Sequence, residues 1–559
     1  MTRSAVRTSK SISFRRLAPS LMVVIFGMLI LFVGAAEEPY NIDELRQTRH
    51  YDKSFQRIID ESFLVGQPPL DPLVNAQAQR ILGVGDIQQR LLSIIFGTGS
   101  LVVMAVLCLR SGLAPMGSAV VVAVMALTPV LINVTAYARP YALPLFLMLS
   151  YLLLVDYWLA GARWLCFVTL SCVAVLLPLS KTVEPMIFLV LTIVAMGLNA
   201  LRDPALRFRS SLGTVPALLG LMTGALLQAR LSSELSDYTK GHEYPLVDRL
   251  MRLVTDLPNT LTAQLPYWPL LLIAIGLLLM NRERRTRLFQ LWWWWVLTGT
   301  AIGFAVALFV TVPTSQPFYG RYVFSWVPSV AVLAGSLVPD SSSDSGPRDR
   351  IFRVFSLSVA VGILAWAFFG SFQTLTTHQG GDWRAASEVI VDDLPKGTAV
   401  VFDPVRPLGS YRTPFAGNPR YTGTAPVRMT LQIIHDPSLI AAGENTAILL
   451  HGSKVVVPGW VPISVDDFFT VYVPETPRPG LEGVASSAED FGTAIGPISG
   501  AAFKLTAAAI WQRAGDVERA SDLLSTMLDS SRLRPVVLDA IRGSDLETLL
   551  PTGVDDHEG

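Results

Sequence analysis

The chain has 559 residues, of which 51% are hydrophobic and only 16% are charged, and its mean hydropathy is +0.45. Ordinary soluble domains carry about 25% charged residues, so this composition excludes a typical soluble enzyme. Apolar runs of about 18 residues or more, long enough to cross the hydrocarbon core as helices, recur along the first two thirds of the chain. The sequence therefore predicts a polytopic α-helical membrane protein.

The formal net charge of zero conceals two oppositely charged parts. Residues 372–559 contain 14 Lys and Arg against 23 Asp and Glu, a net charge of −9, so the first 371 residues carry +9. A basic membrane part followed by an acidic, less hydrophobic tail predicts separate domains. The tail has no basic face, which argues against nucleic acid as a partner.

Eleven apolar runs are predicted to span the membrane. They cover residues 17–36, 91–109, 115–135, 140–160, 164–180, 185–201, 212–229, 267–280, 288–312, 322–339 and 352–371. The Trp292–Trp295 cluster near one end of its run is interpreted as part of an interfacial aromatic belt. Residues 1–371 thus form the predicted membrane domain, with long polar loops at 37–90 and 230–266.

The basic residues predict the orientation of these spans. Arg3, Arg7, Lys10, Arg15 and Arg16 precede the first span, which places the N-terminus in the cytoplasm of a plasma (inner) membrane protein. Alternation then keeps the other basic clusters inside and puts both long loops and the acidic tail outside. The basic start and the run ending in "FVGAAEE" also fit a cleavable signal peptide, although an apolar run of about 19 residues favours a retained anchor.

The short outer turns contain three basic residues that escape this inside bias, because Arg139, Lys181 and Arg321 fall at the predicted outer ends of different spans. A charge near hydrocarbon is costly, about 2.5–3.5 kcal/mol at a helix centre. Several cations on one face suit a phosphate, which arginine can bind in a bidentate manner. The alternatives are snorkelling towards lipid headgroups and, for Lys181, a local ion pair with Glu184 three residues later.

Two carboxylates, Asp43 and Glu44, follow the first span by only a few residues. At the outer membrane surface such a group can act as general base towards a hydroxyl or hold a divalent cation against a phosphate. The alternative is a solvated pair that begins a helix. No histidines have the spacing of metal ligands, so no histidine metal site is predicted.

The outer tail is predicted to contain two parts. Residues 372–480 alternate a helical stretch with β-rich runs and indicate a small extracytoplasmic α/β domain. Residues 481–559 have apolar positions at helical spacing, interrupted at Gly515 and Asp516, and indicate one helical hairpin of tetratricopeptide type before a disordered end. Such a hairpin is a candidate surface for a protein partner.

Six motifs in this order resemble the integral-membrane GT-C glycosyltransferases, the group of the protein O-mannosyltransferases and the lipid A aminoarabinose transferase. They are the Asp43–Glu44 pair, "QPPLDPLVN" (67–75), "LGVGDIQQRLLSIIFG" (82–97), "YARPYAL" (137–143), "RYVFSWVPSVAVL" (321–333) and "DWRAASEVI" (382–390). The chain departs from the family at Leu70-Asp71-Pro72, where an aromatic or a histidine is common after the paired prolines. It departs again at "LSKTVEPM" (179–186), where a histidine-containing turn is common.

The resemblance implies an inverting transfer of a sugar at the outer membrane face. The donor would be a polyprenyl-phosphate-linked sugar, and the acceptor a hydroxyl of a lipid, a glycan or a protein. Asp43 matches the family's general base, with Glu44 beside it, and Arg139 and Arg321 fall where the family places arginines near the donor phosphate. Topology adds Lys181 to these cations, and the neighbouring Tyr137, Tyr141 and Tyr322 are candidate substrate contacts.

Two other functions stay open from the sequence. A flippase or transporter of lipid-linked sugars would use outer cations along a headgroup path, but it should show charged or broken helices at the midplane and internal repeats. The predicted spans are nearly free of charge except at their ends, which favours transfer. The other alternative is an inactive cell-envelope scaffold whose hairpin recruits enzymes.

Overall fold

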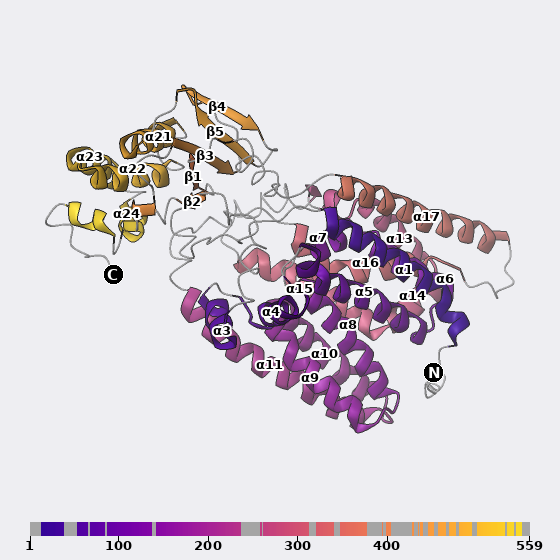
Figure 1. Cartoon of the computed structure of the whole chain (residues 1–559). Helices are drawn as coiled ribbons and strands as arrows, with labels where there is room; N and C mark the ends of the chain where they lie inside the picture. Colours follow the sequence, from indigo (N-terminus) through magenta and orange to yellow (C-terminus); the bar gives the residue numbers. More distant parts are fainter. Residues whose placement is uncertain are drawn as a thin grey trace. The chain divides into compact units, whose positions relative to one another are not determined.

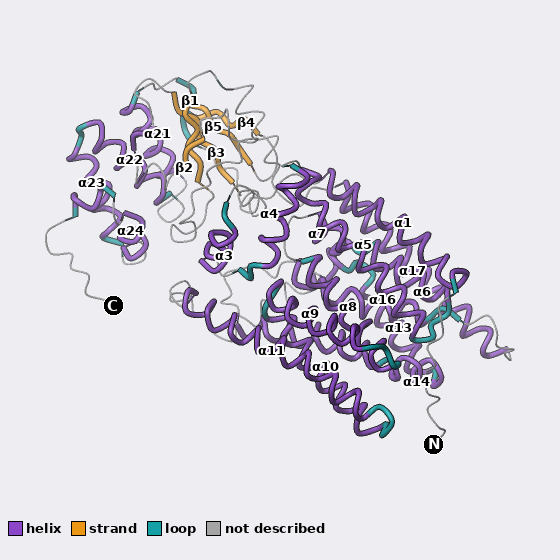
Figure 2. Tube along the Cα trace, turned by 60° about the horizontal axis from the view of Figure 1, so that its bottom comes forward, coloured by secondary structure: helices purple, strands orange, loops and turns teal. Residues whose placement is uncertain are grey.

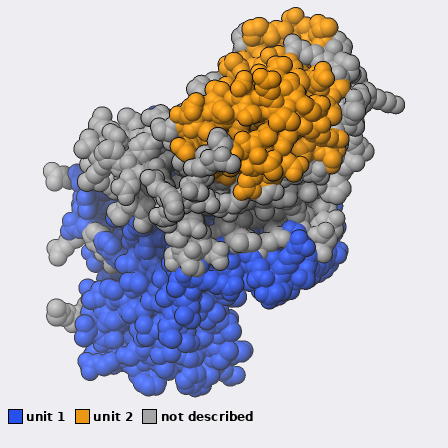
Figure 3. Space-filling model, turned by 90° about the vertical axis from the view of Figure 1, so that its left-hand side faces the viewer, with its two compact units in different colours: residues 1–38, 47–377 blue, residues 39–46, 378–559 orange. Residues whose placement is uncertain are grey.

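The computed structural model divides the chain into two compact units, residues 1–38 with 47–377 and residues 39–46 with 378–559 (Figure 3). The residues that the structure describes are 13–37, 53–64, 67–83, 86–136, 141–235, 258–259, 261–311, 320–339, 347–376, 394, 398–403, 427–429, 434, 437–439, 445–451, 457–464, 469–476, 480–494, 500–530, 534–541 and 544–550.

The described elements of the first unit are all helical, whereas the strands belong to the second unit (Figures 1 and 2). The helices of the first unit are α1 (Phe14–Glu37), α3 (Phe55–Leu64), α4 (Leu70–Leu82), α5 (Asp86–Arg110), α6 (Pro115–Ala126), α7 (Pro129–Ala136), α8 (Ala142–Leu159), α9 (Trp164–Ser180), α10 (Val183–Arg202), α11 (Arg207–Leu235), α13 (Trp268–Met280), α14 (Arg282–Gln290), α15 (Trp292–Thr311), the 3₁₀ helix η1 (Gly320–Trp326), α16 (Val327–Ser336) and α17 (Pro347–Thr376). Most of their buried apolar side chains form one large core.

Each predicted span coincides with one helix or with two consecutive helices. Among the described residues, six helices are long and apolar enough to cross a membrane alone, and the bent pair α6–α7 makes a seventh. Helices α9 and α13 and the segment Val323–Ser336 are apolar but shorter. The chain is therefore a polytopic helical membrane protein, and the number of eleven spans stays a prediction.

The α6–α7 pair bends by 56° at a break of two residues. Pro129 opens α7 and brings no backbone N–H, so the ladder of α6 cannot continue through it. Thr128, at the break, accepts or donates a hydrogen bond with the Tyr267 hydroxyl at 2.7 Å, and both side chains are fully buried. The Thr128 hydroxyl at the break is thus hydrogen-bonded inside the bundle.

Small residues allow two helices to approach closely at α6 and α16. A Cβ on Gly335 would lie 2.5 Å from the Gly117 carbonyl oxygen and 2.4 Å from Val121 Cγ2. A larger residue at position 335 would therefore clash with backbone atoms, and one of the two helices would have to move. This contact fixes α16, and the η1 segment before it, against the first half of the bundle.

The second unit packs helices on a five-stranded mixed sheet. Its strands β1 (Thr398–Asp403), β2 (Val427–Met429), β3 (Asn445–His451), β4 (Trp460–Ser464) and β5 (Phe469–Pro474) have the order β2-β1-β3-β5-β4. Strand β1 is parallel to β2 and β3, whereas β5 is antiparallel to β3 and β4. The helices are η4 (Pro437–Leu439), α21 (Leu481–Ala494), α22 (Ala501–Ala514), α23 (Val517–Leu528), α24 (Arg534–Ile541) and η5 (Asp545–Leu549).

Sheet and helices share one hydrophobic core, in which the Phe491 ring of α21 contacts the rings of Tyr472, Trp460 and Phe503. Helix α22 ends at Gly515, which has φ +92°, a conformation that glycine adopts most easily. The Asp516 side chain then accepts a hydrogen bond from the Arg519 N–H and caps α23. The apolar face of the predicted hairpin is therefore used within the unit, against α21 and the sheet.

The interpretation of the tryptophan cluster as an interfacial belt is wrong for two of its members. Trp293 and Trp294 are 1% and 7% exposed. Their indole N–H groups donate to Ser111 Oγ at 2.7 Å and to the Ser329 carbonyl at 3.1 Å. These two tryptophans link helices within the bundle, whereas Trp292 is partly buried and Trp295 is 47% exposed.

Candidate functional site

The structure describes only some of the side chains that the sequence predicts for a site. Asp43, Glu44, Tyr137 and Arg139 lie outside the described residues. Arg321 and Tyr322 belong to η1, of which the backbone is described but not these two side chains. The positions of Lys181 and Tyr141 are described, and they lie beside each other.

Lys181 forms a short ion pair with Glu184. Its Nζ lies 2.6 Å from Glu184 Oε2, and the side chains are 18% and 0% exposed respectively. The other oxygen of the carboxylate, Oε1, is also buried and has no hydrogen-bond partner among the described residues. Burying such an oxygen without a hydrogen-bond partner costs about 1–3 kcal/mol. A carboxylate in this state is therefore unusual in a membrane protein.

Three aromatic rings from different parts of the chain surround the Lys181 ammonium. Its Nζ lies 4.5 Å from the centroid of the Phe324 ring, 4.8 Å from that of Phe304 and 5.3 Å from that of Tyr141. The Tyr141 and Phe324 rings also meet edge to face at 5.9 Å. Cations are attracted to ring faces at these distances, and more strongly where water is excluded.

The helices themselves favour the charges of this pair. Lys181 directly follows the last residue of α9, where the carbonyl groups at the helix end favour a cation. Glu184 lies in the first turn of α10, where the free N–H groups favour an anion. A two-residue turn, Lys181 and Thr182, joins the two helices. The geometry of the pair is thus set by the local chain and held by distant aromatic rings.

The same end of the bundle holds further buried polar side chains, and we call it the Lys181 end. It is the end at which α1, α7 and α9 stop and α5, α8 and α10 begin. There Arg90, fully buried in α5, donates to the Ala35 carbonyl of α1 at 2.7 Å. Asn133 of α7 donates to Gln264 Oε1 at 3.1 Å. Polar groups of several helices therefore meet at this end.

Two helices within the predicted first loop pack at the Lys181 end. Helix α4 turns Asp71, Asn75 and Gln79, each four residues apart, into buried positions, and Asn75 donates to Asp71 at 3.0 Å. The proline motif at 67–75 therefore begins a helix with a buried polar face. Contacts with α5 and α9 bring this helix against the membrane bundle.

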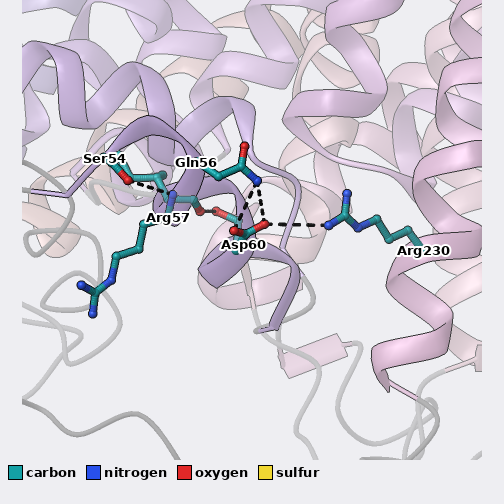
Figure 4. Close-up of polar contacts among 7 residues, drawn as sticks. Ser54, Gln56, Arg57, Asp60 and Arg230 are labelled. Carbon is teal, nitrogen blue, oxygen red and sulfur yellow. Dashed lines mark hydrogen bonds and ion pairs between the residues drawn. The ribbon is translucent and has the colours of Figure 1, made fainter.

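Helix α3 packs on α11, as Figure 4 shows. Ser54 accepts a hydrogen bond from the Arg57 N–H at 3.3 Å at the start of the helix, and Asp60, which accepts from Gln56, lies 3.9 Å from Arg230 of α11. Beneath them, Phe63 joins Leu227 and Leu231 in a small core that also contacts Leu179 of α9. The predicted first loop therefore packs against α9 at Leu179, two residues before Lys181.

We call the opposite end of the bundle the basic end, and three of its arginines bond to oxygens at or near helix ends. Arg110 Nε lies 2.5 Å from Asp156 Oδ2, with both side chains about one tenth exposed. Arg209 donates to the Trp158 carbonyl at 2.7 Å, and Arg284 donates to the Leu337 carbonyl at 2.5 Å. These cations satisfy carboxylate and carbonyl oxygens of the bundle itself.

Sequence reasoning assigned Glu184 only a role as the local partner of Lys181, and it missed Phe304 and Phe324. The i+3 spacing of Lys181 and Glu184 was a visible signal. No local signal joins Phe304 to Lys181, because more than 100 residues separate them. Among the described residues, no three His, Cys, Asp or Glu side chains group as metal ligands.

Comparisons with known proteins give a structural likeness without a sequence match. A scan against protein-family models found no match, and neither did a search of curated proteins. The chain is similar to the crystal structure of ArnT from Cupriavidus metallidurans in the apo state, with 14% identity and a TM-score of 0.47, over 81% of this chain and 97% of that one. The same protein bound to undecaprenyl phosphate matches with 13% identity and a TM-score of 0.43, at the same coverage.

A third similar structure is that of the arabinofuranosyltransferase AftD from Mycobacteria, with 13% identity and a TM-score of 0.41. The match covers 83% of this chain but only 42% of AftD. The resemblance to GT-C membrane glycosyltransferases read from the sequence is thus found again as a structural match over about 81% of the chain. At these identities and TM-scores, the likeness assigns no activity, substrate or site residue.

Proposed function

We propose that this protein is a membrane glycosyltransferase that moves a sugar from a polyprenyl-phosphate-linked donor to a hydroxyl of a lipid, glycan or protein. Transfer takes place at the Lys181 end of the bundle, which the basic residues predict to be the outer face. The transfer inverts the configuration of the sugar carbon, and Asp43, with Glu44 beside it, removes the proton of the attacking hydroxyl. No metal is assigned, although the carboxylates would also suit a divalent cation held against the phosphate.

One observation carries this proposal: Lys181 contacts the ring of Tyr141, two residues after Arg139, and the ring of Phe324, three residues after Arg321. Three segments that each bear a cation outside the inside bias therefore meet at one end of the bundle. A phosphate leaving group develops negative charge as the sugar departs, and fixed cations stabilise that charge. We assign the stabilisation of the phosphate charge to Arg139, Arg321 and Lys181. Tyr137, Tyr141 and Tyr322 are assigned contacts with the substrate.

The two competing functions make different demands on the helices. A transporter of lipid-linked sugars needs polar or interrupted helices along a path through the midplane. The α6–α7 break would suit such a path, but its Thr128 is already bonded to Tyr267. In the six described helices that are long and apolar enough to span a membrane, the charged side chains lie near the helix ends. The inactive-scaffold alternative needs an exposed hairpin surface, whereas the apolar face of α22 is buried. These features favour transfer.

The test is a transfer assay in proteoliposomes that contain the purified protein, a set of polyprenyl-phosphate hexoses and pentoses, and envelope lipid or glycan acceptors. Arg139→Ala and Arg321→Ala should each raise the KM for the donor about tenfold or more, because each removes a charge-assisted hydrogen bond to phosphate. The matched control is Arg163→Ala, an exposed arginine at the basic end, which should leave the KM unchanged.

Two results would contradict the proposal. One is wild-type protein that transfers none of the sugars offered while it moves labelled lipid-linked sugar across the bilayer. The other is equal loss of transfer in Arg139→Ala, Arg321→Ala and the Arg163→Ala control. Either result would remove the link between the Lys181 end and the donor phosphate.

A further inference from the structure

Glu184 has more hydrogen-bonding capacity than Lys181 uses. Its Oε2 holds the ammonium at 2.6 Å, while Oε1 has no partner among the described residues, although the side chain is fully buried. A carboxylate can accept about four hydrogen bonds. Buried polar atoms are almost always satisfied, by protein, by ordered water or by a ligand, so Glu184 Oε1 is able to accept a hydrogen bond from a bound molecule.

The charge of the pair says which kind of donor is suitable. Lys181 and Glu184 together are neutral, and the three rings around the ammonium add no charge. An ionised carboxylate is an acceptor only, so it repels a phosphate oxygen and binds an O–H or N–H group. In the donor of the proposed reaction, sugar hydroxyls are the groups of this type.

The contact between Lys181 Nζ and Glu184 Oε2 at 2.6 Å favours a sugar hydroxyl that lies close to the phosphate. Two ligand groups that bind Lys181 Nζ and Glu184 must themselves be near neighbours, because their protein partners are in contact. In a glycosyl phosphate, the hydroxyl on the carbon next to the phosphate-bearing carbon is the sugar hydroxyl closest to the phosphate oxygens. Hydrogen bonds to this 2-hydroxyl are known to strengthen in the transition state of glycosyl transfer to water.

We infer that Glu184 is a sugar-recognition residue: its Oε1 accepts a hydrogen bond from the 2-hydroxyl of the donor sugar while Lys181 faces the adjacent phosphate. This inference rests on the proposed function. It assigns the specificity for the sugar to an ion pair in the turn between α9 and α10, and the affinity for the lipid phosphate to the arginines.

The experiment compares binding of three probes to the purified full-length protein: polyprenyl phosphate alone, its hexose conjugate, and the 2-deoxy form of that conjugate. In the wild type, the hexose conjugate should bind roughly tenfold more tightly than the 2-deoxy form, the effect of one hydrogen bond to a charged acceptor. Glu184→Gln, which keeps the shape and removes the charge, should reduce this ratio to about two or less. Binding of polyprenyl phosphate alone should stay the same or become tighter, because Lys181 loses its counter-ion.

The matched control is Asp156→Asn at the basic end, where an ion pair of similar burial is broken in the same chemical way. This variant should lower thermal stability and leave the ratio between the two conjugates at its wild-type value. Glu184→Asp, which keeps the charge but shortens the side chain, gives a second variant and should lower the ratio without loss of folded protein.

The outcomes separate the two proposals. If Glu184→Gln weakens all three probes in parallel, or leaves the wild-type ratio intact, Glu184 is a structural partner of Lys181 and the inference is overturned. A wild-type ratio near one overturns it as well. If the wild type binds none of the probes, the proposed donor itself is wrong, and both proposals fail together.

Discussion

The two ends of the membrane bundle differ in how completely their buried ion pairs are satisfied. At the basic end, Arg110 meets Asp156, and Arg209 and Arg284 donate to carbonyl groups of neighbouring helix ends. At the Lys181 end, one ion pair lies among rings of three different segments and keeps a buried oxygen unpaired among the described residues. The first arrangement is complete by itself, whereas the second has capacity for a ligand.

This difference teaches how charge in a membrane helix can be interpreted. Cations at the basic end are explained by the positive-inside rule and by the oxygens that they satisfy. Lys181 also satisfies an oxygen, Glu184 Oε2, but it lies on the side predicted to lack cations, and the second oxygen of its partner has no donor among the described residues. A buried ion pair that keeps unused hydrogen-bonding capacity is the better candidate for function.

The largest expected difference between the ends concerns the carboxylate predicted to be the base. Asp43→Asn should lower the rate of sugar transfer by about 10²- to 10⁴-fold, because an amide cannot remove the proton of the acceptor hydroxyl. The measurement is the initial rate in proteoliposomes with saturating donor. Unchanged donor binding in the same variant would show that the loss is chemical.

The control for Asp43→Asn is Asp522→Asn, the same change at an exposed carboxylate of α23. This variant should transfer sugar at the wild-type rate. Wild-type transfer by Asp43→Asn would overturn the assignment of the base and leave Glu44 or a bound cation as the alternative.

The basic end should respond in stability and not in activity. Arg110→Ala leaves Asp156 as a buried charge without its main partner, which should cost about 3–5 kcal/mol in the free energy of unfolding. The double variant Arg110→Ala, Asp156→Ala should lose less, because no lone charge remains. Thermal unfolding in detergent measures both, and donor affinity of the folded fraction should equal that of the wild type. A tenfold loss of affinity would place donor recognition at the wrong end.

The membrane helices could be predicted from the sequence because they depend on a local feature, the length of apolar runs. Apolar runs fix where helices lie, and each predicted run coincides with a helix or a broken pair. Helices α3, α4 and α14 were not predicted, since they are short and their faces are polar or mixed. The tryptophan cluster was misinterpreted for a related reason: composition identifies an aromatic run, but only packing tells which side of the helix meets lipid.

The candidate site could be predicted only in part. Exceptions to the charge bias identified Arg139, Lys181 and Arg321, and spacing identified the Lys181–Glu184 pair. The aromatic rings around Lys181 come from contacts between distant spans, and no period or motif encodes such contacts. The unpaired oxygen of Glu184 could not be foreseen at all, because a sequence contains no record of which atoms remain without partners.

The smallest of these effects tests whether the basic end is held by packing as well as by charge. Gly335→Ala places a Cβ 2.5 Å from the Gly117 carbonyl oxygen, so α6 and α16 must separate, at a cost of about 1–3 kcal/mol. Gly276→Ala in α13 is the matched control, because its Cβ would meet nothing within 4 Å. Alanine is the better helix former, so this control should keep or slightly raise the stability.

The readout is the thermal midpoint in detergent, and the two variants should shift it in opposite directions or by clearly different amounts. Equal shifts would mean that α16 is not held by this contact, and that the segment leading to Phe324 owes its position to the Lys181 end alone.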